Sequence, residues 1–103
     1  MSTADQILGA RIAAVAGRHA SRGKIDDLEQ AVAELREVAG DRPDLLAEFA
    51  GVSLGLAEGG IPSLAPKYRA EAELARAAGA DEGQIGQWIG IGRNRTGQAR
   101  LAP

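Results

Sequence analysis

Side chains that could do chemistry are few in this sequence, and none has the neighbours that catalysis requires. His19 is the only histidine, and no carboxylate or second ligand stands at helical spacing from it, as a general base or a metal ligand would need. The four serines lack any local motif of an activated nucleophile. The absence of cysteine removes thiolate chemistry and Cys-based zinc sites. We therefore expect a protein that is not an enzyme and that holds no cofactor and no metal.

Paired carboxylates and closely spaced glycines also have a structural explanation. Asp26 and Asp27 stand at a predicted helix start, and Glu34 and Glu37 stand on a polar helix face, so capping and solvation account for both pairs. The glycines of residues 86–92 follow no strand and have no lysine among them, so they do not form a phosphate-binding loop.

The most informative stretch is residues 74–92, LARAAGADEGQIGQWIGIG. Gly79 can adopt the left-handed conformation that ends a helix, and Asp81 with Gln84 matches a capping box that starts the next one. Ile85 and Trp88 then fall on one face of that second helix. The stretch predicts two short helices joined by a tight turn.

This stretch resembles the helix-turn-helix of repressor-type DNA-binding proteins and covers about a fifth of the chain. In that family a small residue, a turn glycine, an aliphatic residue and an apolar residue recur at fixed spacing, matched here by Ala75, Gly79, Ile85 and Trp88. The resemblance implies that a helix from Glu82 enters the major groove. There Gln84 and Gln87 could read adenine edges, and Arg93 and Arg95 could contact phosphates.

Charge argues against that function. Asp81 and Glu82 would lie near the phosphates, where affinity normally comes from Lys and Arg. DNA binding is therefore the alternative hypothesis, and a helical hairpin with Trp88 as its core anchor is the simpler interpretation. As a whole, the chain resembles the small uncharacterised helical proteins of GC-rich bacteria, and this resemblance implies no activity.

Start and stop signals predict an all-α fold, a compact array of about five short helices whose last two form the helix-turn-helix-like hairpin. The first begins near Ala4, after a Thr3–Gln6 capping pattern, and ends before Gly23; the second runs from Asp26 to Gly40; the third opens at 41–43 and ends at 59–60; the fourth starts at Pro66; and the fifth runs from about Glu82 to Gly92. Residues 1–92 should form a single domain, with 61–66 as a hinge. Residues 93–103 form a basic tail that we expect to be frayed or extended.

Two predicted helices carry small residues at four-residue spacing, a pattern that lets another helix approach closely. The ridge of the first helix is Gly9, Ala13 and Gly17, and the ridge of the third is Ala47, Gly51 and Gly55. Each interior glycine lowers helix stability by about 1 kcal/mol relative to alanine. A close contact at each ridge would compensate for that loss.

Charge is segregated along the chain: residues 26–60 hold nine acidic and two basic residues, between basic ends. Either these are ordinary solvated helix faces, or the ends fold onto the middle, or molecules associate through them. With no signal peptide and no membrane-length apolar run, a cytoplasmic location is expected. The leading prediction is a small non-enzymatic interaction module that binds a protein partner or itself.

Overall fold

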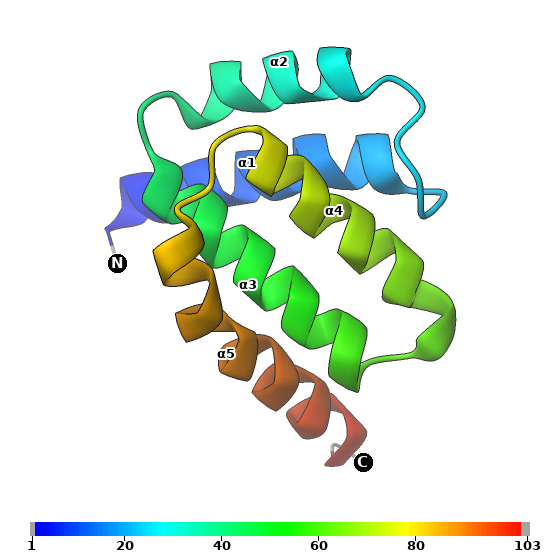
Figure 1. Ribbon diagram of the computed structural model, residues 1–103. Coiled ribbons are helices and arrows are strands. Elements are labelled where there is room, and N and C mark those ends of the chain that lie inside the picture. The colour runs from blue at the N-terminus through cyan, green and yellow to red at the C-terminus, as the bar shows by residue number, and fades with distance from the viewer. Residues whose placement is uncertain (1, 102–103) are drawn as a thin grey trace.

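The computed structural model describes the backbone of residues 2–101 and the side chains of residues 2–95. Five α-helices and one short 3₁₀ helix make up this part of the chain (Figure 1): α1 (Thr3–Ala20), α2 (Leu28–Ala39), α3 (Pro43–Gly59), η1 (Pro62–Leu64), α4 (Ala65–Ala77) and α5 (Glu82–Leu101). No strand occurs among residues 2–101. The prediction of a compact all-α array of five helices is confirmed.

Local signals set most of the helix ends. Pro43 opens α3 as predicted, and the positive φ of Gly40 and Gly79 ends the elements before them. Two predicted caps are wrong by one residue. Ser2 rather than Thr3 caps α1 by accepting from the backbone N–H of Asp5, and Asp27 rather than Asp26 caps α2 by accepting from that of Gln30, because a cap must lie directly before the first helical residue.

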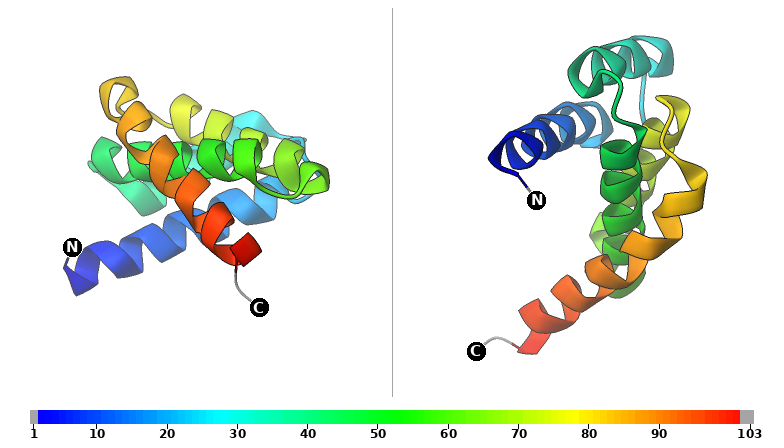
Figure 2. Two further views of the ribbon diagram at one scale, coloured as in Figure 1. Left: turned by 90° about the horizontal axis from the view of Figure 1, so that it is seen from below. Right: turned by 90° about the vertical axis from the view of Figure 1, so that its left-hand side faces the viewer.

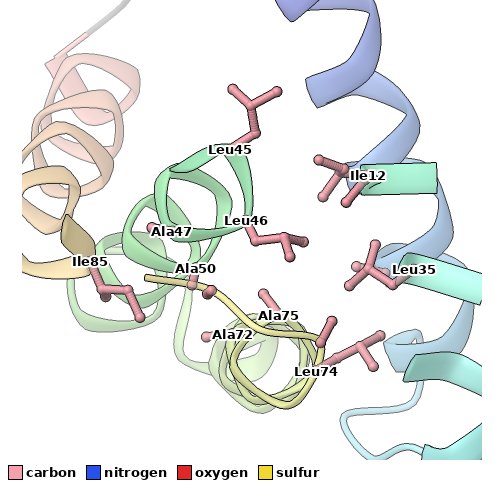
Figure 3. Close-up of a cluster of buried hydrophobic side chains, with 14 of the residues drawn as sticks. Ile12, Leu35, Leu45, Leu46, Ala47, Ala50, Ala72, Leu74, Ala75 and Ile85 are labelled. Atoms are coloured by element: carbon pink, nitrogen blue, oxygen red, sulfur yellow. The ribbon is translucent and has the colours of Figure 1, made fainter. Parts of the chain in front are cut away.

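Helix α3 is the centre of the fold. Helix α5 packs along one side of it and α4 along another, while the pair α1 and α2 lies across α3 and α4. Figure 3 shows the core side chains meeting at these contacts, with Ile12 and Leu35 facing Leu46, and Ile85 packed on another side of α3. Alanine fills much of the rest, which keeps the helix axes close.

The closest helix contact is the one between α3 and α5, and it is made of backbone. A methyl group at Gly51 would fall 2.5 Å from the Cβ of Trp88, and one at Gly55 would fall 2.8 Å from the amide nitrogen of Arg93. From the other side, a methyl group on Gly92 would lie 2.9 Å from the Cα of Gly55. The compensating contact expected at the ridge of the third helix is therefore made, and α5 makes it.

Two features of the C-terminal half differ from the sequence-based expectation. The end of the last helix predicted at Gly92 is wrong, because α5 continues to Leu101, and residues 102–103 lie outside the described residues. Arg, Gln, Ala and Leu dominate the added turns and favour helix without an apolar period. In addition, α5 does not fold back on α4 as a hairpin; α3 lies between them, and the two helices scarcely touch.

Helix α2 faces the core with Ala31, Leu35 and Ala39, whereas Leu28 at its start is 49% exposed. Within the described residues, no helix is long and apolar enough to cross a membrane.

Candidate interaction groove

A groove of about 320 Å³ opens between α1 and α5, over the middle of α3. Both helices pack on α3 but lie apart from each other, as the right-hand view of Figure 2 shows. The floor is apolar and the rim is charged; the lining consists of Asp5, Gln6, Gly9, Ala10, Ala13, Glu48, Phe49, Val52 and Arg95. Phe49 and Val52 are half-buried floor residues, and Phe49 also packs against the core.

The α1 wall of this groove is open. A Cβ added to Gly9 would meet no atom within 4 Å, and Ala13 is exposed. Only Gly17, at the far end of the same ridge, lies near another element, with 3.8 Å between its added Cβ and the Glu71 carboxylate. Helix α1 packs on the body through the neighbouring face that carries Ile12 and Ala16. The two ridges therefore differ although their spacing is identical. Helix α5 packs against the α3 ridge, whereas no described element packs against most of the α1 ridge.

Asp5, which lines the groove, belongs to a fork of ion pairs. The Arg42 guanidinium donates to Asp5 at 2.8 Å and to Asp44 at 3.0 Å. These hydrogen bonds hold the pKa of both carboxyls below their usual range. They tie the first turn of α1 to the first turn of α3, so Asp5 is already neutralised within the chain.

Glu48 is the carboxylate of the groove with no such partner. Burial raises the pKa of Glu48, and the charge of Arg95 acts in the opposite direction from α5. Among the described residues, neither Glu48 nor Arg95 makes an ion pair or a side-chain hydrogen bond. Besides Gln6 and the paired Asp5, the groove thus presents one acid and one base that lack a direct hydrogen-bonded partner among the described residues.

Elsewhere, the basic ends fold onto the acidic middle. Glu34 of α2 accepts from Arg18 at 2.6 Å and from His19 at 2.8 Å, and Arg93 of α5 pairs with Glu58 of α3. The hydrogen bond from His19 is the main reason why the pKa of Glu34 lies below its usual range. His19 therefore does have a carboxylate partner. It is supplied by the next helix, where helical spacing along α1 could not show it.

A buried polar cluster lies between α1, α3 and α4. The only local pattern in the sequence that indicates it is the i,i+4 spacing of Lys67 and Glu71. Glu71 is 4% exposed and Ser53 is 2% exposed. Glu71 accepts from the Lys67 ammonium at 2.8 Å and from the Ser53 hydroxyl at 3.5 Å, and the first bond raises the pKa of Lys67. Because Ser53 is enclosed, the cluster serves packing and not nucleophilic chemistry.

The residues expected to contact DNA do not all lie on one surface. Gln84 is half-buried and Gln87 is exposed. Arg93 and Arg95 are two positions apart on a helix, which places them roughly 160° apart around its axis; Arg93 pairs with Glu58, whereas Arg95 lines the groove.

The start of α5 is acidic where a recognition helix would need positive charge. Asp81 and Glu82 are both exposed, and the basic residue beside them, Arg76, is already paired with Glu82 at 3.0 Å. The Asp81 carboxylate accepts from the backbone N–H of Gly83 and so caps the helix. Trp88 is half-buried and holds α5 against Gly51.

Within the part of the chain that the structure describes, no group of three His, Cys, Asp or Glu side chains is arranged to hold a metal ion. No protein-family model, curated protein or solved structure matches the chain.

Proposed function

We propose that this chain is a small non-enzymatic protein-interaction module, whose groove between α1 and α5 accepts a helix of a protein partner. The observation that carries the proposal is the open α1 wall: Gly9 has no neighbour within 4 Å of its missing side chain, while the matching glycines of α3 are in backbone contact with α5. A helix can approach a glycine- and alanine-lined surface closely enough for extensive van der Waals contact.

The floor supplies the apolar surface that such docking needs. Phe49 and Val52 are half-buried at the base of the groove, and aromatic residues in a partly enclosed position are frequent anchors of protein interfaces. An amphipathic helix that lays its apolar side in a hydrophobic groove is a recurrent recognition mode. The charged rim would then fix the orientation of the bound helix.

The groove offers little support for catalysis. Glu48, with its raised pKa, is the kind of group that could act as a general acid or base. The remaining polar lining groups, however, are Gln6, Arg95 and the already paired Asp5. A hydrolase or transferase would require a nucleophile or a second titrating group beside Glu48.

DNA binding, the alternative, has weaker support. The face that starts α5 carries Asp81 and Glu82, and Arg93 is engaged by Glu58. Fluorescence anisotropy with a labelled duplex tests this alternative directly. Under the interaction-module proposal, no binding that falls with salt is expected. Binding that decreases steeply with salt and weakens in Arg93→Ala would favour the regulator instead.

The direct test of the proposal is a photo-crosslinking amino acid on either side of α1. Gln6 lines the groove, whereas Arg11 is exposed and lies outside it. With the benzophenone at position 6, irradiation in the cells that express the chain should give a discrete crosslinked protein product; at position 11 it should not.

A second pair of variants shows whether such a product depends on the groove. Ala13 and Ala14 are adjacent and both exposed, and Ala13 alone of the two lines the groove. Ala13→Trp should abolish the product from position 6, because the indole fills the space, and Ala14→Trp should leave it intact. Equal products from positions 6 and 11, or none, would refute the proposal.

A further inference from the structure

We infer that the occupant of the groove is the α1 face of a second copy of this chain, in a two-fold dimer whose rims meet with Glu48 of each copy opposite Arg95 of the other. The inference rests on the proposed function and names its partner. Three observations support it, namely the charges of the rim, the composition of the α1 face and the nature of the other exposed helix faces.

The rim specifies a partner with one acid and one base. Asp5 is neutralised by Arg42, so Glu48 and Arg95 are the charged lining groups that no described residue pairs. A polyanion would meet Glu48 unfavourably, and a strongly basic segment would meet Arg95 unfavourably. An identical surface turned through a two-fold axis presents Arg95 to Glu48 and Glu48 to Arg95, which satisfies both charges at once.

The α1 face has the properties of the helix that the groove would accept. Gly9, Ala10 and Ala13 present small apolar surface with no charge among them. The same residues form one wall of the groove, so two copies brought face to face bury the open wall of each against the other. In this arrangement Gly9 gains the close neighbour that it lacks within the chain.

Most other exposed helix faces of the chain are poor occupants. The outer face of α2 carries Glu29 and Glu37, and that of α4 carries Arg69 and Glu73, all exposed. Inserting such charges into a groove floored by Phe49 would cost desolvation without compensation. The uncharged α1 face avoids that cost, and two-fold pairing places all charges at the rim.

Charge exchange between Glu48 and Arg95 gives the sharpest test. Sedimentation equilibrium of the wild type should show a concentration-dependent rise from 10.6 kDa toward twice that mass. Glu48→Arg and Arg95→Glu should each weaken the dimer by about tenfold or more, since symmetry applies every changed contact twice. An equimolar mixture of the two variants should dimerise again, because each then meets the opposite charge on the other.

The mixture shows whether Glu48 and Arg95 interact between two chains or only within one chain. If Glu48 and Arg95 interacted only inside the chain, mixing would restore nothing, and the inference would be wrong. Since the sequence has no cysteine, Ala13→Cys and Ala14→Cys each carry a unique thiol. A short bis-maleimide should link two chains through position 13 and not through position 14; equal linkage through both would also overturn the inference.

Failure of this inference and failure of the proposed function are distinguishable. A wild-type chain that stays at 10.6 kDa at all concentrations overturns self-association. If the benzophenone at Gln6 nevertheless captures a different protein in an Ala13-dependent manner, the groove is an interaction site with another occupant. If it captures nothing, the proposed function is wrong as well. Circular dichroism of each variant confirms that it is folded before its association is measured.

Discussion

Substituting alanine for glycine in two helices should give opposite changes in stability, because one glycine is in contact and the other is not. At Gly55, the added methyl group would fall 2.8 Å from two backbone atoms of α5, the Arg93 nitrogen and the Gly92 Cα, and still closer to the carbonyl oxygen of Ile89. At Gly90, it would meet nothing within 4 Å. Both glycines lie in helices, so the helix-propensity gain is the same for the two, about 1 kcal/mol.

The contact with α5 decides whether Gly55→Ala raises or lowers the stability of the fold. Overpacking of a close contact costs about 1–3 kcal/mol, and more when the opposing atoms are backbone that no rotamer change can move. Subtracting the propensity gain of about 1 kcal/mol from the upper end of that range leaves a net loss of about 2 kcal/mol. For a domain of this size, the melting temperature should fall by roughly 8 °C or more. Gly90→Ala should instead raise it by roughly 4–8 °C.

Thermal unfolding followed by circular dichroism at 222 nm measures both changes, and urea titration provides the free energies. Gly90→Ala serves as the matched control, since both glycines lie in helices but no neighbouring helix among the described residues packs against the carbon substituted at Gly90. A Gly55→Ala protein as stable as Gly90→Ala would refute the backbone contact between α3 and α5. It would also remove the reason for assigning glycine at this position to packing.

Three further predictions concern charged groups. Lys67→Met should destabilise the fold by about 1–3 kcal/mol in urea titration, because it leaves Glu71 buried without its cation; an unchanged midpoint would show that Glu71 does not need the pair. Arg42→Ala should lower stability at neutral pH and converge with the wild type in acid, since the lowered pKa values of its partners give stability that is lost as pH falls through them. At a concentration too low for two copies to associate, Glu48→Gln should have the opposite effect: because the folded pKa of Glu48 is raised, removing its charge should stabilise the fold at neutral pH, and the difference should disappear in acid. Melts across the pH range check both, and parallel curves would contradict them.

The sequence by itself determined the number and type of the elements and most of their ends. Pro43, Gly40 and Gly79 act within one helical turn, through a fixed φ or a left-handed conformation. Such signals are readable because the interactions span three or four residues. The extension of α5 past Gly92 has no apolar period that would predict it, because helix-forming residues can continue an established helix without one.

Tertiary structure decided which of these elements meet. The ridges at Gly9 and at Gly51 have the same spacing and the same composition class, yet one is open and the other is filled by α5. Likewise, Glu34 pairs with His19 across two helices, and Glu71 is buried although nothing beside it in the sequence is unusual. These outcomes depend on the path of α5 along α3 and of α2 along α1. That path is set by the summed packing of residues far apart in the chain, which no local spacing encodes.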